Sequence, residues 1–277
     1  MILPNSITTI GQFSFSDCNS LKSLTIPKSV LTIGNCAFYG CESLESIEVD
    51  SENIKYDSRG NCNAIIETYT DRLIWGCKNT VIPQDVKTIG EDAFAGNIDM
   101  KYLYFPNSVT TIERGAFSGC KELNTLNVGN NVELIESYAF QECSGIQSVI
   151  IPQKVKSIGY WTFRDCIRLK DFYCYAEYIP TTHAEAFIET PIENATLHVP
   201  AALVETYKNS SPWSGFGKIV ALTDDDPKPT DVQTLPKEEN TTPSAIYALD
   251  GRLISKPQRG VNIIRMRDGS VRKVIAK

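Results

Sequence analysis

The stretch PNSVTTIERGAFSGCKELNTLNV, residues 106–128, contains the pattern that decides the fold of this 277-residue chain. It reads as a proline, a Thr-Ile step, an Ala-Phe pair, a cysteine and a Leu-x-x-Leu-x-aliphatic run. Further copies start at Pro4, Pro27, Pro83, Gly129 and Pro152. The starts lie 23 residues apart, except for one step of 56 between Pro27 and Pro83. A fixed period of this length predicts a solenoid, in which each coil of the chain stacks on the next.

Each apolar letter of the pattern recurs at the same place in every copy. The most regular columns are isoleucine (Ile10, Ile33, Ile89, Ile112, Ile135, Ile158) and phenylalanine (Phe15, Phe38, Phe94, Phe117, Phe140, Phe163). β-branched residues favour a short strand, and stacked aromatic rings bury a large area. The Leu-x-x-Leu-x-aliphatic run alternates with polar residues, which indicates a second strand with one buried face. The predicted fold class is mainly β: a leucine-rich repeat solenoid, with repeats of about 23 residues and a parallel sheet along its length.

Five of the nine cysteines occupy one further column: Cys18, Cys41, Cys120, Cys143 and Cys166. Residues of one column lie about one strand spacing apart, roughly 4.8 Å, on neighbouring coils. A free cysteine packs as a small apolar side chain. A metal site needs ligands that converge in a tetrahedron, and a linear column does not converge. The spacing therefore predicts a column of buried free thiols rather than disulfides or a metal centre, and we expect no cofactor.

The chain divides into four parts. Residues 1–177 form the solenoid, with an irregular long repeat at about residues 50–82 that is either a larger coil or a protruding recognition loop. Residues 178–222 break the pattern and form a C-terminal cap, in which a short helix and Trp213 close the open end. Residues 223–243 are rich in proline and charge and indicate a linker. Residues 244–277 contain Asp-Gly steps at Asp250 and Asp268, which predict a small separate β-hairpin module.

The consensus PxxVxxIGxxAFxxCxxLxxLxIP resembles the repeat of the BspA-like, or Treponema pallidum-type, leucine-rich repeat family of bacterial surface proteins. The resemblance covers roughly residues 1–222. It implies a solenoid exposed outside the cell that binds macromolecules of a host or a neighbouring cell, and it implies no catalytic residues. The segment from residue 246 to residue 277 is similar to the C-terminal sorting segments of secreted Bacteroidetes proteins, which implies a role in export or surface attachment.

Composition and motifs exclude several classes of protein. The net charge of −6 gives no general attraction to nucleic acid. No apolar run is long enough to cross a bilayer, and no export signal is recognisable. Asp224, Asp225 and Asp226 lack the ligand spacing of a calcium loop. The two histidines, His183 and His198, accompany no nucleophile motif, and no pair of carboxylates suits hydrolysis of a polysaccharide. We therefore expect a monomer that is not an enzyme.

With these sites excluded, the positions that vary between repeats and point outward from the longer strands are the candidates for a functional surface. Alternation along these strands turns Tyr102, Tyr104, Ile150 and Tyr173 outward together. Tyrosine beside serine and threonine is typical of protein-recognition surfaces, although tyrosine is also a good strand former. A second candidate surface, Tyr138 with Trp161, lies at the opposite edge of the coils.

Two functions follow from this pattern. The first is a secreted or cell-surface adhesion protein that recognises a host or neighbouring-cell protein or glycan along the sheet. The alternative is a structural spacer of the cell surface that attaches through the C-terminal module.

Overall fold

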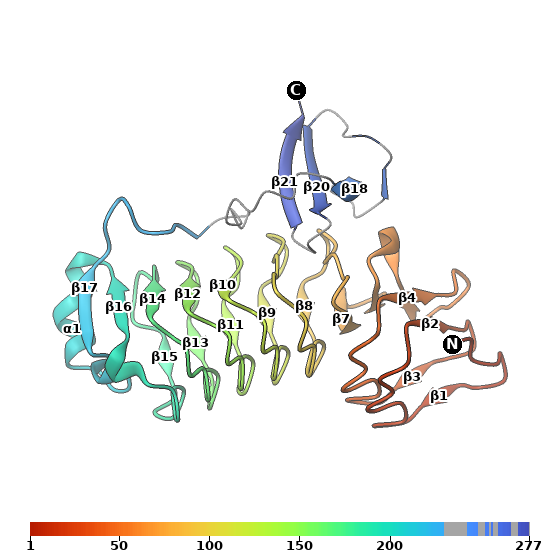
Figure 1. The fold of residues 1–277 in the computed structure, drawn as a ribbon, viewed down its shortest axis with the longest axis horizontal. Helices are drawn as coiled ribbons and strands as arrows, with labels where there is room; N and C mark the ends of the chain where they lie inside the picture. The colour runs from red at the N-terminus through yellow and green to blue at the C-terminus, as the bar shows by residue number, and fades with distance from the viewer. Residues whose placement is uncertain (230–242, 249–252, 255, 257–259, 267–270, 277) are drawn as a thin grey trace.

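The predicted solenoid is confirmed by a computed structural model, which describes residues 1–229, 243–248, 253–254, 256, 260–266 and 271–276. The regular coils contribute two short strands each, except the coil that starts at Pro83, which contributes one, and the coils form an elongated stack (Figure 1). The first strand comes from the Thr-Ile step and lies in the back sheet. These strands are β1 (Thr9–Ile10), β3 (Thr32–Ile33), β8 (Thr88–Ile89), β9 (Thr111–Ile112), β11 (Leu134–Ile135), β13 (Ser157–Ile158) and β15 (Thr181–Thr182).

The second strands lie in the front sheet; those of the repeats come from the Leu-x-x-Leu-x-aliphatic run, and β16 and β17 come from residues 178–222. These strands are β2 (Ser23–Ile26), β4 (Ser46–Val49), β10 (Thr125–Asn127), β12 (Ser148–Ile151), β14 (Asp171–Cys174), β16 (Thr196–Val199) and β17 (Lys218–Ala221). All pairs between them are parallel, and the register matches equal positions of successive repeats, such as Val149 with Phe172. The front sheet has two parts, β2-β4 and β10-β12-β14-β16-β17.

The phenylalanine column fills the space between the two sheets. The rings of Phe94, Phe117, Phe140 and Phe163 are fully buried. Neighbouring ring centres lie 5.0–5.7 Å apart, with planes within 10° of parallel. Because each of these rings touches its neighbours, one core runs from the long repeat to the cap instead of a separate core in each coil. The first coils have a second core, which includes Phe38, Ile65 and Trp75.

The cysteine column lies beside the phenylalanines, and all nine cysteines of the chain are free thiols. Cys41, Cys120, Cys143 and Cys166 each place Sγ 3.0–3.4 Å from the carbonyl oxygen of the phenylalanine of the preceding coil. Thr190 occupies the same column, and its Oγ1 donates to the carbonyl of Phe163. The column thus supplies a second donor to carbonyls that already accept a backbone N–H of their own turn, as Phe117 does from Cys120.

The irregular long repeat extends the back sheet. It forms β5 (Tyr56–Asp57), the 3-10 turn η1 (Arg59–Asn61), β6 (Ala64–Glu67) and β7 (Arg72–Gly76). β5, β6 and β7 pair antiparallel, and β7 then pairs parallel with β8. The back sheet has two parts: the pair β1-β3, and eight strands in the order β15-β13-β11-β9-β8-β7-β6-β5. The extra residues therefore add strands to the stack.

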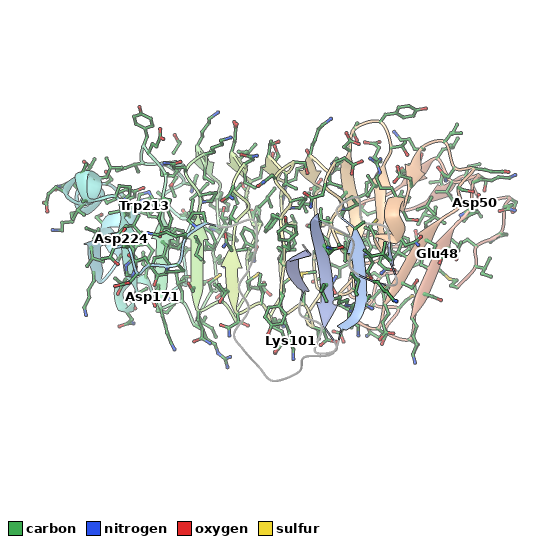
Figure 2. The ribbon with its side chains drawn as sticks, turned by 90° about the horizontal axis from the view of Figure 1, so that it is seen from above. Glu48, Asp50, Lys101, Asp171, Trp213 and Asp224 are labelled. Atoms are coloured by element: carbon green, nitrogen blue, oxygen red, sulfur yellow. The ribbon has the colours of Figure 1, made fainter. Side chains whose placement is uncertain are left out.

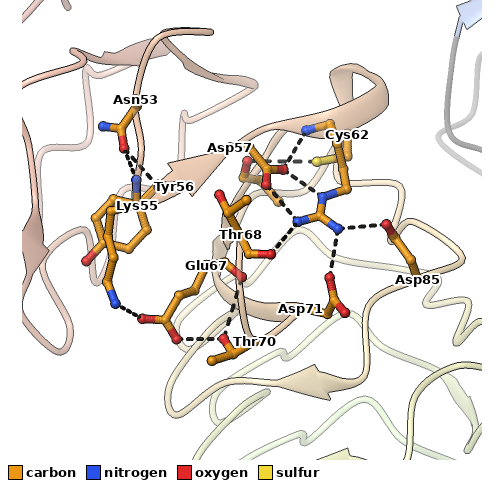
Figure 3. A network of polar contacts seen from close by, with 12 residues as sticks. Asn53, Lys55, Tyr56, Asp57, Cys62, Glu67, Thr68, Thr70, Asp71 and Asp85 are labelled. Carbon is orange, nitrogen blue, oxygen red and sulfur yellow. Dashed lines mark hydrogen bonds and ion pairs between the residues drawn. The ribbon is translucent and has the colours of Figure 1, made fainter.

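One arginine holds this repeat together. The Arg59 guanidinium contacts the carboxylates of Asp57, Asp71 and Asp85 at 2.7–2.8 Å. Figure 3 shows these three carboxylates turned toward one point, beside the carbonyl of Thr68. Asp85 belongs to the start of the next coil, so the ion pairs join the hairpin to the regular repeats.

Residues 178–222 cover the last regular coil. They contain β15, the 3-10 turns η2 (Ile192–Asn194), η3 (Ala201–Leu203) and η4 (Trp213–Gly215), the helix α1 (Val204–Lys208), and strands β16 and β17. Trp213 is fully buried, and its ring lies 5.3–5.6 Å from those of Phe172, Phe187 and Tyr207. These rings continue the phenylalanine column and shield its end from water.

The C-terminal residues form an antiparallel sheet of four strands. They are β18 (Pro243–Ala248), β19 (Leu253–Ile254), β20 (Gly260–Met266) and β21 (Val271–Ala276), in the order β19-β18-β20-β21. Of the predicted Asp-Gly turns, the Asp250 and Asp268 steps lie outside the described residues, as do residues 230–242 of the predicted linker. The sheet lies against the middle of the front face, as both views show (Figures 1 and 2).

Candidate partner-binding surface

The tyrosines predicted to form one outward patch on the front sheet have three different surroundings. Tyr104 packs against Val81, Tyr247 and Ile263, so the C-terminal sheet covers it. Tyr102 is half-buried on the same coil. Neither residue lies in a strand, because residues 101–105 form none. The sequence predicted a separate C-terminal module. The contact of this module with Tyr104 is the reason that the ring is partly covered and not open to solvent as expected.

Ile150 and Tyr173 lie further along the front face and also differ from the expectation. Ile150 is only 4% exposed, because it lies between Asn127 and Tyr173 on the paired strands at either side. The Tyr173 ring stacks on His198 with centres 4.2 Å apart. Burial raises the pKa of Tyr173 to about 12. The predicted front patch is therefore not a continuous exposed surface.

The second predicted pair, Tyr138 and Trp161, belongs to a larger group at the edge of the coils. We call this group the aromatic–arginine ladder; its members are Arg114, Tyr138, Tyr160, Trp161, Arg164 and His183. Tyr160 stacks on Trp161 with ring centres 4.6 Å apart, and Tyr138 meets both rings edge-on at 5.6 Å. The ladder crosses four successive coils.

Two arginines complete the ladder. The Arg114 guanidinium carbon lies 4.8 Å from the centre of the Tyr138 ring, and that of Arg164 lies 4.2 Å from the Trp161 ring. Such cation–π contacts contribute about 0.5–1 kcal/mol each at exposed sites. Arg164 also binds Glu189, which holds its planar group over the ring. The arrangement fixes six polar or aromatic side chains on a rigid edge.

Polar side chains of neighbouring coils hold the ladder residues in place. The Trp161 indole N–H donates to Glu185 Oε2 at 2.8 Å. This bond, followed by one from Tyr160, lowers the pKa of Glu185. Glu136 Oε2 accepts the backbone N–H of Arg114 at 3.1 Å, and Ser137 Oγ accepts that of Tyr160 at 3.2 Å. Each turn is thus tied to the next by a side chain as well as by the sheet.

The backbone of the ladder is left-handed at one position of each turn. Tyr138 and Trp161 have φ of +64° and +54°, and the equivalent residue one coil earlier is Gly115 with φ +63°. Left-handed backbone costs a residue with a side chain roughly 1–2 kcal/mol. Phe13, Cys36 and Asp92 have positive φ at the same position of other coils. The conformation is therefore a property of the repeat turn, and the ladder is distinguished by the large aromatic rings that two coils place there.

A groove runs beside the ladder. Its volume is about 450 Å³, and its lining residues are Arg114, Leu134, Ile135, Glu136, Ser137, Tyr138, Ser157, Gly159 and Tyr160. Gly159 forms part of the floor, since a Cβ there would lie 2.4 Å from the backbone nitrogen of Ser137. The groove combines two tyrosine rings, one guanidinium, one carboxylate and two serine side chains. It can hold a side chain of a partner next to the ladder.

Sequence reasoning found Tyr138 and Trp161 but missed their neighbours. Tyr160 and His183 lie 23 residues apart and so share a column, which was a signal that the spacing offered. Arg114 and Arg164 could not be assigned, because the direction of a long side chain is not fixed by repeat spacing. Within the described ranges, no group of three or more His, Cys, Asp or Glu side chains is placed to hold a metal ion. None of the helices found there is long and apolar enough to cross a membrane.

Comparison with known proteins gives both a sequence family and structural neighbours. The family model described as "BspA type Leucine rich repeat region" matches six copies over residues 1–69 and 64–193. A leucine-rich repeat protein from Eubacterium ventriosum is 25% identical, with a TM-score of 0.62 over 87% of this chain and 68% of that one. No curated protein matches.

Two further solved structures share the fold. The pneumococcal vaccine antigen PcpA is 22% identical with a TM-score of 0.57, over 78% of this chain and 60% of that one. A leucine rich cell surface protein from Faecalibacterium prausnitzii is 23% identical with a TM-score of 0.53, over 80% of this chain. The alignment covers 53% of that protein, so this chain matches little more than half of its length.

Proposed function

Because the chain belongs to the BspA-type leucine-rich repeat family, we propose that it is a non-catalytic binding protein of the bacterial cell surface. Support for the location comes from the neighbour that is named a cell surface protein. Support for binding comes from the rigid array, which presents side chains at fixed spacing over several coils. The finer assignment concerns the surface that makes contact and the class of partner.

The aromatic–arginine ladder supports recognition of a partner better than the front sheet does. Tryptophan, tyrosine and arginine are the residues most enriched among those that dominate binding energy at protein interfaces. Here they gather on one edge, beside a groove of about 450 Å³. They are half-buried or exposed rather than buried. On the front sheet, by contrast, Ile150 is buried and Tyr104 is covered.

We favour a protein over a glycan as the partner. A sugar ring binds an aromatic side chain through an open ring face. Trp161 has Tyr160 stacked on it and Arg164 placed over its ring. Its edge and the neighbouring polar groups remain for contact, which suits the mixed side chains of a protein surface.

The test measures binding of the purified chain to immobilised extracellular-matrix and epithelial surface proteins, and in parallel to a glycan array. The decisive variant is Tyr138→Asn with Trp161→Asn. Asparagine tolerates positive φ, so the change removes both rings without adding backbone strain. We expect binding to a protein of the panel to weaken by about tenfold or more, because such residues each contribute about 1–2 kcal/mol or more.

The matched control is Tyr69→Asn with Tyr178→Asn, which removes two tyrosines that are 83% and 81% exposed outside the ladder. Binding should be unchanged in this control. Equal binding by the ladder variant and the wild type would refute the site. A wild-type chain that binds only glycans would refute the partner class. A chain that binds neither panel would refute the function in favour of the spacer alternative.

A further inference from the structure

The front sheet is interrupted at one place, and the C-terminal sheet lies over it. Strand β4 ends at Val49, and the next front strand is β10. In the coil between them, residues 101–105 form no strand. The view from above shows β18 and β20 lying across this part of the array, near Lys101 (Figure 2).

The contact between the two parts is specific. Val81, Tyr247 and Ile263 form one buried cluster and are 3–6% exposed; Tyr104 and Ala245 pack against it. The register pairs Ala245 with Arg265 and Tyr247 with Ile263, so these four residues lie on one face of the C-terminal sheet. The Arg265 guanidinium donates to the side-chain oxygen of Asn79. The same face thus supplies both the apolar and the polar contacts to the solenoid.

Energetics make this docking important for the C-terminal sheet. A sheet of about 34 residues buries little apolar surface by itself and gains stability by packing on something larger. Residues 222–228 contact the solenoid, as in the hydrogen bond from the Tyr175 hydroxyl to the carbonyl of Pro227 at 3.0 Å. Residues 229–242 connect them to β18, and a chain of that length reaches roughly 50 Å when extended. The connection therefore does not dictate where the sheet sits, and the contact does.

From this geometry we infer that the surface formed by Asn79, Val81 and Tyr104 is a second interaction surface of the solenoid, which the chain's own C-terminal sheet covers. Its occupant in the resting molecule is the Ala245–Tyr247–Ile263–Arg265 face. A competing partner needs the same chemistry: a β-hairpin with alternating apolar side chains and a cation. The surface is distinct from the aromatic–arginine ladder, so this inference stands apart from the proposed function.

Covering in cis has a clear physical advantage. Two groups joined by a connecting segment meet at an effective concentration in the millimolar range. A contact as small as this one is then sufficient to bury Val81 and partly cover Tyr104. An apolar patch that is exposed only after release of the sheet also lowers the risk of non-specific association.

The experiment measures hydrogen exchange on the full-length chain. Val81→Asp places a charge under the sheet, and Ile263→Asp places one on the docking face itself. Both should speed exchange in peptides of β18 and β20, on the order of tenfold or more, because the sheet loses its packing partner. Ile263→Asp should also speed exchange in peptides that contain residues 79–81 and 101–105.

Val220→Asp is the control, since Val220 is a 37% exposed residue of the last front strand. It should leave exchange of β18 and β20 unchanged. If Val81→Asp also unfolds the regular coils, the Ile263→Asp result decides, because that residue lies outside the solenoid. Unchanged exchange of β18, β20 and residues 79–81 in Ile263→Asp would overturn the inference.

Discussion

Arg59 places its guanidinium 2.7–2.8 Å from the carboxylates of Asp57, Asp71 and Asp85. Burial alone would raise the pKa of Asp57, but hydrogen bonds from Arg59 hold that pKa below its usual value. Lys87 and Arg59 together lower the pKa of Asp71. At this scale the fold depends on charge: one cation compensates three acidic groups that the irregular repeat brings together.

Arg59→Met removes the cation and keeps much of the apolar stem. We expect the free energy of unfolding to fall by roughly 1–3 kcal/mol, because the acidic groups remain together and partly desolvated. Urea denaturation measures this loss. Arg168→Met, at an exposed arginine, serves as the control and should change little. Equal stability of the two variants would show that the ion pairs do not hold the repeat.

The ion pairs of Arg59 should also make the folding stability depend on pH. The pKa values of Asp57 and Asp71 are lower in the folded chain than their usual 3.8, so their contribution is fully present above about pH 4 to 5 and is lost as the pH falls through the lowered values. Wild-type stability should therefore decrease on acidification from pH 5 to 3. In Arg59→Met the decrease should be smaller, as measured by thermal melting at each pH. A steeper decrease in the variant would contradict the assignment.

At the scale of elements, the cysteine column shows what spacing can and cannot predict. The 23-residue period correctly predicted free thiols; Cys120, Cys143 and Cys166 are buried as expected, whereas Cys18 and Cys41 are only partly buried. It did not predict that the thiols from Cys41 onward donate to a phenylalanine carbonyl of the preceding coil, as Cys143 does to Phe117 at 3.1 Å. It also did not identify Thr190 as a member of the column, because the pattern has cysteine at this position. The threonine hydroxyl makes the same kind of hydrogen bond as the cysteine thiol.

Thiol reactivity checks the column. Burial raises the pKa of Cys143 to about 12 and those of Cys120 and Cys166 well above the usual 9.0. These thiols should stay unmodified by iodoacetamide at pH 8 in the native chain and react after denaturation, since the thiolate is the reactive form. Cys18, which is only partly buried, should react first. Mass spectrometry after digestion gives the extent at each site, and rapid native labelling of Cys143 would contradict the packing.

At the scale of the whole molecule, the solenoid was predictable because every coil has the same packing arrangement. The Ile and Phe columns place the same buried side chains in each copy of the repeat. The position of the C-terminal sheet was not predictable, because it depends on one non-repeating contact between Tyr247, Ile263 and Val81. Tyr104 was therefore assigned to an open surface that the structure covers. The ladder was predictable only in part. Its aromatic residues occur at fixed positions of the repeat, and its arginines do not.

The central claim is that recognition occurs at the aromatic–arginine ladder, and a binding footprint tests it most directly. Hydrogen exchange is measured for the chain alone and with the panel protein that binds it most strongly. The account predicts slower exchange in peptides that contain residues 113–119, 136–142 and 159–165 when the partner is present. Slower exchange confined to the front strands β10, β12 and β14, with no change at the ladder, would contradict it.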